Sequence, residues 1–431
     1  MSPLWIYGGA MALFMAWYLG RRASRARRHA GRLAQAQAAG LTEPASLHPV
    51  IDPLRCIGSG TCASACPEKA IAIVDNKAVL ADGSACIGHG ACLAACPVDA
   101  IRLVFGTEQR GVDIPQLSAS FETSVPGIFI AGELGGMGLI RKAAEQGRQA
   151  IDAIRRRKGR GDADLDVVIV GAGPAGLSAG LSAKAASLRY RVIEQETSLG
   201  GAIYHYPRNK IAMTAPIDLA LVGKVRMGEI SKEALLAFWN GTIERTRLEV
   251  SLGERMEAIA ARADGTFDVR TSRGTLHAAS VLLAIGRRGT PRKLDVPGET
   301  LPKVVYRLVD AQQYRGRRVL VVGGGDSALE AAIALADVEG CRTTLSYRRK
   351  AFDRVKARNR EQLAERARAG RLRLMLESEV QIITPDAVRL RAAEGFVALP
   401  NDAVVICAGG TLPTPLLREI GIRFETRFGT A

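Results

Sequence analysis

Six of the eight cysteines lie close together in the chain and form two runs with the same spacing. The first run is Cys56-x5-Cys62-x3-Cys66-Pro67. The second repeats it 30 residues further on, with Cys86, Cys92 and Cys96 before Pro97. Thiolates at fixed intervals are typical ligands of zinc and of iron–sulfur clusters. The other two cysteines, Cys341 and Cys407, are isolated, and we interpret them as small core residues.

The repeat resembles the two-cluster bacterial ferredoxins, whose motif is C-x2-C-x2-C-x3-C-P. The resemblance covers roughly residues 50–105. In that family the fourth cysteine of each run ligates the other cluster. Carried over, this implies one three-cysteine set per cluster: Cys56, Cys62 and Cys96 for one, and Cys86, Cys92 and Cys66 for the other. This chain departs from the motif twice, because Ser59 and His89 stand where the family has its second cysteine.

Three thiolates per cluster leave two alternatives open. Each cluster is either [3Fe–4S], or [4Fe–4S] with a fourth ligand that is not cysteine. Imidazole suits iron, so His89 is a better candidate ligand than Ser59; the alternative is that His89 is a turn residue between Gly88 and Gly90. Zinc is a third option, although the repeated Cys-Pro favours iron–sulfur. Disulfides are not expected on the cytoplasmic side of a membrane.

A glycine-rich turn between an apolar strand and a helix is the second feature that predicts chemistry. Val167–Val170 reads as a buried strand, and residues 177–186 read as the helix that follows. The turn between them holds Gly171, Gly173, Pro174 and Gly176 in a G-x-G-x-x-G pattern. Such glycines admit a pyrophosphate at the helix N-terminus. A second strand, Tyr190–Ile193, ends at Glu194, whose carboxylate can bind ribose hydroxyls, so the stretch predicts a dinucleotide site.

A second nucleotide site is predicted after the strand Val319–Val322. The pattern is G-x-G-x-x-A with Gly323 and Gly325, and Asp326 and Ser327 open the helix. The next strand, 343–346, leads to Arg348 and Arg349 and carries no acid. Two guanidiniums without an acid favour a ribose 2′-phosphate, so NADP(H) is expected here, with NAD(H) as second choice. The alternative is that both arginines are solvated surface charges.

Residues 121–133 resemble the T-x-x-P-G-x-x-x-A-G-D segment of flavoproteins of the thioredoxin-reductase-like, pyridine nucleotide-disulfide oxidoreductase class. This resemblance covers roughly residues 118–431. It implies bound FAD, with Gly132 and Glu133 at the ribityl–phosphate region and Gly201 near the flavin. It also implies a permuted order, because the segment that ends the FAD domain in that class precedes the first glycine loop here. His205 lies near the flavin ring or packs within its loop.

The N-terminal stretch and the composition complete the domain prediction. Residues 3–19 are uncharged, mostly apolar and flanked by aromatic residues, and five arginines follow within residues 21–28. This pattern predicts one transmembrane helix, inner-membrane localisation and cytoplasmic catalytic domains. The formal charge of +16 means that nucleic-acid binding must be considered. We find no surface that combines basic and aromatic residues for base stacking, so we exclude nucleic acid as a partner. Residues 30–49 are rich in Ala and Gln and suggest a tether.

The predicted fold class is α/β. Two Rossmann-like domains follow an α+β ferredoxin-like domain and the transmembrane helix. The predicted boundaries are 1–20 for the anchor, 21–49 for the tether, 50–106 for the iron–sulfur domain, 107–299 for the permuted FAD domain, 300–410 for the NAD(P) domain and 411–431 for a tail on the FAD domain.

The expected function is electron transfer without a catalytic side chain. No C-x-x-C dithiol follows Gly200-Gly201 or lies in the nucleotide domain, so a protein disulfide is not the expected acceptor. We predict a membrane-anchored oxidoreductase that passes electrons from NADPH through FAD and two clusters to a ferredoxin, cytochrome or quinone. The alternatives are a small-molecule reductase with accessory clusters and a membrane-tethered redox or iron sensor. The prediction also allows for a homodimer.

Overall fold

The computed structural model describes residues 4–38, 44, 47–86, 88–108, 111–136, 138–157, 162–206, 210–213, 216–287, 290–352, 355, 357–411 and 413–429. The chain forms two compact units. The first comprises Met1–Val112 with Asp353–Ala357 and Arg427–Ala431, and the second comprises Asp113–Phe352 with Arg358–Thr426.

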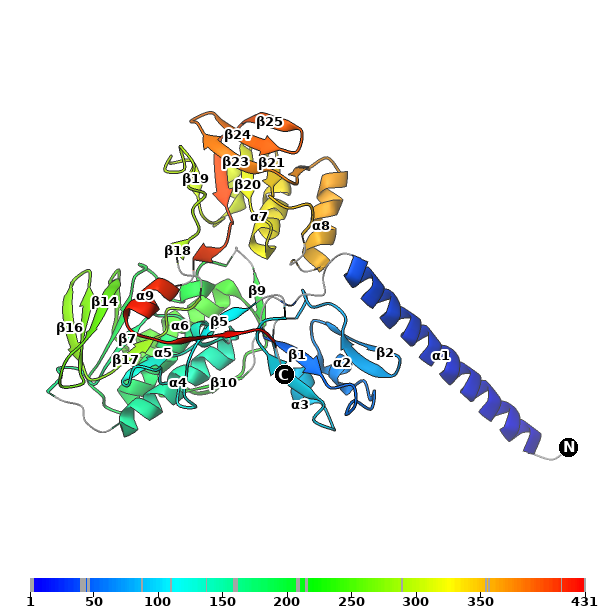
Figure 1. Ribbon diagram of the computed structural model, residues 1–431, viewed down its shortest axis with the longest axis horizontal. Coiled ribbons are helices and arrows are strands. Elements are labelled where there is room, and N and C mark those ends of the chain that lie inside the picture. Colours follow the sequence, from blue (N-terminus) through cyan, green and yellow to red (C-terminus); the bar gives the residue numbers. More distant parts are fainter. Residues whose placement is uncertain are drawn as a thin grey trace. The chain divides into compact units, whose positions relative to one another are not determined.

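The first unit contains the cysteine repeat, and each run contributes one short helix, α2 or α3 (Figure 1). Each cysteine run leads from a short helix to a strand. The elements are β1 (His48–Ile51), α2 (Thr61–Ala65), β2 (Ile71–Val74), β3 (Lys77–Leu80), α3 (Ala91–Ala94) and β4 (Ile101–Val104). β1 pairs with β4 and β2 with β3, both antiparallel. Their small core includes Ile71, Ile101 and three of the cysteines.

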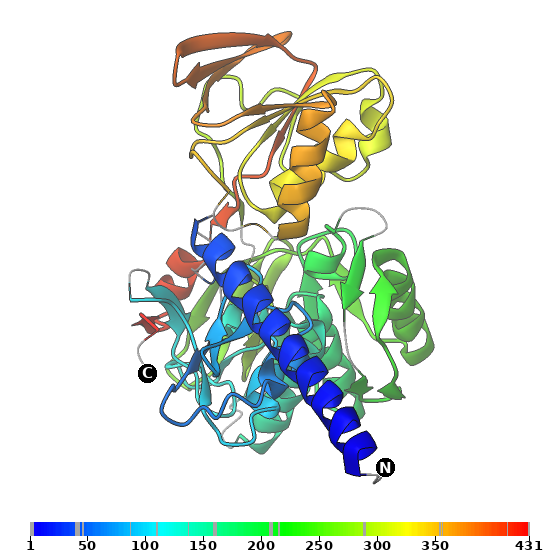
Figure 2. The same cartoon turned by 90° about the vertical axis from the view of Figure 1, so that its right-hand side faces the viewer.

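The predicted membrane span is wrong. α1 (Leu4–Ala38) is one unbroken helix that runs from the apolar residues into the arginine-rich stretch (Figures 1 and 2). Within the described part of the chain, no helix has the length and apolar character needed to cross a membrane. The uncharged stretch 4–19 would rise only about 24 Å, against ~30 Å of bilayer core. The predicted single-pass inner-membrane localisation is therefore also wrong.

The expected tether is helical as far as Ala38, because Ala, Gln and Arg are good helix formers. The C-terminal half of α1 packs on β2. The Ile73 amide donates to His29 Nδ1 at 2.7 Å, and the Arg32 guanidinium donates to the Lys69 carbonyl. These contacts attach α1 to the iron–sulfur part of its unit.

The second unit is built on two five-stranded parallel sheets, as the α/β prediction requires. The first sheet has the order β13-β8-β7-β17-β6. Its strands are β6 (Ile128–Ile130), β7 (Val167–Val170), β8 (Tyr190–Glu194), β13 (Val250–Leu252) and β17 (Val281–Leu283). All four residues of β7 are buried, as expected for a parallel strand covered on both faces. β6 precedes β7 in the chain, yet it lies at the sheet edge and pairs with β17.

Helices and a small sheet surround the first parallel sheet. The helices are α4 (Ile140–Arg156), α5 (Pro174–Ala185), α6 (Lys232–Thr246) and α9 (Thr414–Glu419), with the 3-10 turns η1 (Glu133–Gly135) and η2 (Gly201–Ile203). α4 and α5 pack closely against each other. The antiparallel sheet is β14 (Met256–Ala261), β15 (Phe267–Thr271) and β16 (Gly274–Ala278). Three short pairs join β5 (Val112–Pro115) to β28 (Phe424–Arg427), β9 (Ile211–Met213) to β12 (Glu229–Ser231), and β10 (Ile217–Leu219) to β11 (Gly223–Val225).

The second parallel sheet has the order β19-β26-β20-β21-β22. Its strands are β19 (Val304–Val305), β20 (Arg318–Val322), β21 (Arg342–Ser346), β22 (Leu372–Met375) and β26 (Ala403–Ile406). The accompanying helices are η3 (Ala311–Tyr314), α7 (Asp326–Ala336) and α8 (Ala357–Arg368). β23 (Glu379–Ile383), β24 (Ala387–Ala392) and β25 (Gly395–Pro400) form an antiparallel sheet, and β18 (Thr290–Pro291) pairs with β27 (Gly410–Thr411).

Candidate cofactor sites

The turn between β7 and α5 is as tightly closed as the glycine pattern predicts. A Cβ on Gly176 would lie 1.8 Å from the Gly171 carbonyl oxygen, so only glycine fits there. A Cβ on Gly171 would lie 2.6 Å from the Ala284 carbonyl oxygen on the neighbouring strand connection. Pro174 occupies the first turn of α5, where its missing N–H costs no hydrogen bond. The helix therefore begins at Pro174, three residues before its predicted start.

Three of the predicted FAD residues come together at this turn from distant parts of the chain. Gly201 lies against Gly173, since a Cβ on Gly201 would be 3.1 Å from the Gly173 Cα. A Cβ on Gly132 would be 3.2 Å from the Ala175 Cβ, which places η1 and Glu133 beside the start of α5. Glu133 is half-buried. The backbone at this edge of the sheet can therefore approach a dinucleotide closely.

Glu194 stabilises the same turn. Its side chain is only 6% exposed. Oε2 accepts a hydrogen bond from the Ala172 amide at 2.7 Å, and Oε1 accepts one from the Glu196 amide at 3.0 Å. A carboxylate has about four acceptor positions, so ribose hydroxyls can share it with the two amides. Glu194 thus has a structural role that the sequence pattern did not indicate.

α4 contributes two residues that the sequence analysis did not identify. The Gly132 amide donates to Gln146 Oε1 at 2.9 Å, which fixes the entry to η1. A Cβ on Gly147 would lie 2.1 Å from the Ala175 carbonyl oxygen, so α4 crosses α5 at a glycine. No local pattern marks Gln146 or Gly147, because both act on residues that are distant in sequence.

The second nucleotide site has the same strand–turn–helix form. A Cβ on Gly323 would lie 2.3 Å from the Cys407 carbonyl oxygen, whereas one on Gly325 would meet nothing within 4 Å. Open space at the N-cap of α7 is what a phosphate group needs. Ser327 is exposed at the helix start. Asp326 Oδ1 instead accepts from Asn359 Nδ2 of α8 at 2.7 Å, which joins two helices of this site.

The arginines predicted to bind the 2′-phosphate lie just beyond the end of β21. Arg348 and Arg349 are both exposed. The Arg349 carbonyl accepts from the Glu377 amide at 3.2 Å, so this backbone is held by the loop after β22. Tyr347 covers Gly324, where a Cβ would meet its ring at 2.1 Å, and stacks on Phe352 with ring centroids 5.2 Å apart. Tyr347 is a site residue that the sequence analysis missed.

His205 packs between charged side chains of the second unit. Its Nε2 lies 2.9 Å from Arg307 Nη1 and 3.8 Å from Glu196 Oε1. Both interpretations offered for this histidine, near the flavin ring or packed within its loop, stay predictions.

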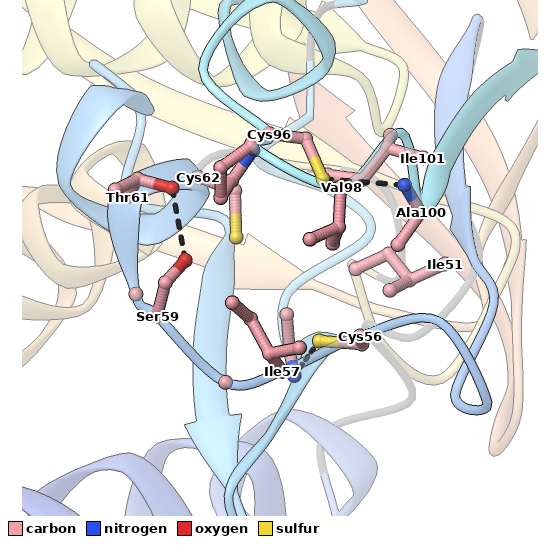
Figure 3. A pocket seen from close by; sticks show the side chains of 14 residues that line it. Ile51, Cys56, Ile57, Ser59, Thr61, Cys62, Cys96, Val98, Ala100 and Ile101 are labelled. Atoms are coloured by element: carbon pink, nitrogen blue, oxygen red, sulfur yellow. Dashed lines mark hydrogen bonds between the residues drawn. The ribbon is translucent and has the colours of Figure 1, made fainter.

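The cysteines form two separate sets in the first unit, and each set draws on both runs. Cys56, Cys62 and Cys96 line one pocket, and their sulfur atoms face a common space (Figure 3). Cys66, Cys86 and Cys92 line the other pocket. These are the two groups that the ferredoxin resemblance implies. Ser59 lies on the first pocket and His89 on the second.

Backbone amides and burial both act on cysteines of the two sets. Backbone amides of Ala70 and Ala100 donate to the sulfur atoms of Cys66 and Cys96 at 3.4 and 3.3 Å. Burial, with smaller contributions from the charges of Cys86 and Cys66, raises the pKa of the Cys92 thiol to about 11. Burial likewise raises the pKa of the Cys62 thiol, with smaller contributions from Cys56 and Cys96.

The arrangement of the thiols bears on the kind of metal group that the two pockets could hold. Among the described side chains, no three His, Cys, Asp or Glu residues converge closely enough to hold one metal ion. A tetrahedral zinc site needs four ligands within about 2.3 Å of the metal. Three thiols spread around a pocket, with N–H donors to sulfur, suit an iron–sulfur cluster better. The donor set therefore fits the predicted group.

Comparisons with known proteins agree with both parts. Residues 168–428 match the family described as pyridine nucleotide-disulphide oxidoreductase, and residues 48–97 match a 4Fe-4S dicluster domain. The chain is 34% identical over 276 residues to the ferredoxin–NADP reductase of Thermus thermophilus, which covers 60% of this chain and 77% of that reductase. It is 34% identical over 221 residues to ferredoxin–NADP reductase 1 of Christiangramia forsetii, covering 50% of this chain and 59% of that reductase.

A solved structure also matches a large part of the chain. The bacillithiol disulfide reductase from Bacillus cereus is 26% identical, with a TM-score of 0.52, and the match covers 60% of this chain and 81% of that one. Since the family match extends over more than half of the residues, the chain belongs to the pyridine nucleotide-disulphide oxidoreductase family and is an FAD-dependent NAD(P)H oxidoreductase with iron–sulfur clusters.

Proposed function

We propose that this oxidoreductase passes electrons from NADPH, through FAD and the two cysteine-bound clusters, to a one-electron acceptor protein of the ferredoxin type. The observation that carries the proposal is the pairing, in one chain, of two nucleotide-binding turns with two three-cysteine pockets. When bound, the flavin supplies hydride chemistry and the clusters supply one-electron chemistry. The ferredoxin–NADP reductases among the relatives support the class of acceptor.

The residues of the first nucleotide turn bind and orient the FAD. Gly173 and Gly201 let backbone approach the FAD pyrophosphate, because neither has a side chain in the way. Glu194 accepts ribose hydroxyls while holding the Ala172 amide. Glu133, beside α5, is assigned to the ribityl–phosphate region by the family resemblance. No side chain is assigned as a general acid or base.

The preference for NADPH over NADH rests on charge. Arg348 and Arg349 follow the strand at which an acid would bind the ribose 2′-hydroxyl, and their exposed guanidiniums can each form charge-assisted hydrogen bonds to a phosphate. The open N-cap of α7 at Gly325 accommodates the pyrophosphate.

The thiols are better suited to holding clusters than to exchanging disulfides. In the described part of the chain the six cysteines of the repeat form no disulfide, and they are divided between two pockets. Cys341 and Cys407 lie far apart in sequence and form no C-x-x-C pair. A dithiol relay of the kind that a disulfide reductase needs is therefore missing from the sequence.

The test separates flavin reduction from electron exit. Cys62→Ser should remove one ligand of the first pocket, and Cys92→Ser one of the second. In anaerobic stopped-flow experiments, we expect NADPH to bleach the flavin at the wild-type rate in both variants. Steady-state reduction of a bacterial ferredoxin by NADPH should fall at least tenfold.

Cys341→Ser provides the matched control, since this buried cysteine lies outside both pockets. It should retain ferredoxin reduction. If ferredoxin reduction survives the loss of both clusters, the flavin delivers electrons directly and the relay is wrong. If NADPH bleaches the flavin but no one-electron acceptor is ever reduced, the enzyme is better described as a small-molecule reductase.

A further inference from the structure

The two cluster pockets differ at several equivalent positions, and two of these differences bear on metal ligation. Ser59 and His89 are related by the 30-residue repeat, and so are Glu68 and Val98. Because each pocket takes residues from both runs, the first receives Ser59 and Val98, and the second receives His89 and Glu68. One pocket therefore holds a hydroxyl and an aliphatic side chain where the other holds an imidazole and a carboxylate.

The backbone around the two positions has the same conformation. Gly58 and Gly60 have φ of 70° and 78°, and Gly88 and Gly90 have φ of 72° and 80°. A Cβ on Gly88 would lie 2.8 Å from the Leu47 carbonyl oxygen, so the His89 turn is packed in place. The glycines that flank Ser59 thus have nearly the same φ as those that flank His89, while the two side chains differ in chemistry.

The serine is engaged within its own loop. Ser59 Oγ lies 3.1 Å from Thr61 Oγ1, and the two hydroxyls face each other in Figure 3. At the equivalent position of the second run stands Ala91, which has no hydroxyl. A neutral hydroxyl in a hydrogen bond is a poor ligand for iron.

The histidine has the opposite character. His89 is exposed at the edge of the pocket that Cys66, Cys86 and Cys92 line, and imidazole suits iron. Glu68 lies on the same pocket as His89. A carboxylate beside a ligating imidazole is a common device for orienting the ring.

We propose that the two clusters are chemically unequal: His89 supplies the fourth ligand of a [4Fe–4S] cluster at the Cys66/Cys86/Cys92 pocket, oriented by Glu68, and the Cys56/Cys62/Cys96 pocket holds a [3Fe–4S] cluster. This inference rests on the proposed function, since it needs clusters in both pockets. An imidazole nitrogen donates its lone pair to the iron that lacks a thiolate, and the N–H remains on the other ring nitrogen. No electron is transferred in forming this bond.

The experiment uses the full chain, purified anaerobically and labelled with ¹⁵N-histidine. Pulsed electron paramagnetic resonance of the dithionite-reduced protein should show a strongly coupled histidine ¹⁵N on the reduced [4Fe–4S] cluster. The oxidised protein should show the signal of one [3Fe–4S] cluster per chain. Iron analysis should give about seven irons per chain, three from one pocket and four from the other.

Matched variants assign the signals. His89→Ala should abolish the ¹⁵N coupling and raise the oxidised [3Fe–4S] signal about twofold, as the second pocket also keeps three ligands. Ser59→Ala, at the equivalent position, should leave both signals unchanged. His89→Cys should keep the four-iron cluster while losing the ¹⁵N coupling. Glu68→Gln should weaken the coupling without removing it.

The possible outcomes are distinguishable. An unchanged ¹⁵N coupling in His89→Ala, or two oxidised [3Fe–4S] signals in the wild type, would overturn the inference and leave the relay intact. Protein that binds flavin but no iron in either pocket would overturn the proposed relay itself.

Discussion

At the scale of single residues, the proposed preference for NADPH rests on the charges beyond β21. Arg348 is exposed and follows a strand that ends without an acid. A guanidinium stabilises a 2′-phosphate, which NADH lacks. Because Arg348 is exposed, water screens its charge, and we expect its contribution to NADPH binding to be moderate.

Arg348→Gln should raise the KM for NADPH about tenfold, equivalent to ~1.4 kcal/mol of binding. The KM for NADH should change less than twofold. Both are measured by NAD(P)H oxidation with an artificial acceptor. Arg342→Gln is the control, because Arg342 is also exposed but lies at the opposite end of β21. Equal effects of Arg348→Gln on the two cofactors would contradict the assignment.

A second prediction at this scale concerns pH. Asp402 accepts from the Arg318 backbone amide at 2.7 Å and from Arg318 Nε at 3.0 Å. These hydrogen bonds hold the pKa of the Asp402 carboxyl well below its usual range. A lowered folded-state pKa contributes stability above the unfolded-state pKa of about 3.9, and this contribution is lost as the pH falls further.

Asp402→Asn should therefore lower the Tm at pH 7. The difference in Tm between the variant and the wild type should become smaller below about pH 4. Differential scanning fluorimetry between pH 7 and pH 3 measures this. Arg318→Gln should lower the Tm in the same way, and the double variant should add little to either single change. A gap that stays constant down to pH 3 would show that the ion pair does not titrate as expected.

At the scale of elements, close helix packing positions the flavin-binding turn. α4 crosses α5 where Gly147 meets the Ala175 carbonyl, and Ala175 also faces Gly132. A side chain at position 147 would push α4 away from the start of α5. The proposed FAD site thus depends on a helix contact whose two partners lie 28 residues apart in sequence.

Gly147→Ala should destabilise the protein by about 1–3 kcal/mol, because the added methyl cannot fit. The purified protein should also contain less flavin. Gly241→Ala is the matched control, since Gly241 lies within α6 and a Cβ there meets nothing within 4 Å. This control should be neutral or stabilise by up to ~1 kcal/mol. Urea unfolding and flavin absorbance measure the two effects, and equal behaviour of both variants would contradict the packing account.

At the scale of the whole second unit, an ion pair links its two nucleotide-binding parts. Lys210 Nζ lies 3.0 Å from Glu330 Oε2, and Glu330 is on α7 of the second site. Lys210 comes directly before β9, in the part built around the first sheet. Both side chains are partly buried, at 33% and 23% exposure.

A double-mutant cycle on Lys210→Ala and Glu330→Ala should give a coupling of about 0.5–1 kcal/mol in urea unfolding. The coupling should shrink at 1 M salt, where the Debye length is ~3 Å. The pair Arg315 and Glu339 is the control, since both its side chains are largely exposed and little coupling is expected. Zero coupling for Lys210 and Glu330 would show that this contact does not join the two parts energetically.

The sequence by itself determined the local units. The β7–turn–α5–β8 pattern, Glu194 at its end and the second glycine turn were all predicted, because each is written in about 30 consecutive residues. The iron–sulfur prediction also came from local spacing. Local hydropathy misled at α1, where an apolar stretch too short to span a bilayer continues as a helix into the arginines.

Only the tertiary structure decided which residues of different local units come into contact. The approach of Gly201 to Gly173, the crossing at Gly147, the Tyr347 ring over Gly324 and the Lys210–Glu330 pair join residues that no short pattern connects. Packing distances and steric exclusion are properties of folded surfaces, so they become visible only when those surfaces meet. Only the folded pockets placed His89 together with Glu68, and Ser59 with Val98, because each pocket combines side chains from both runs.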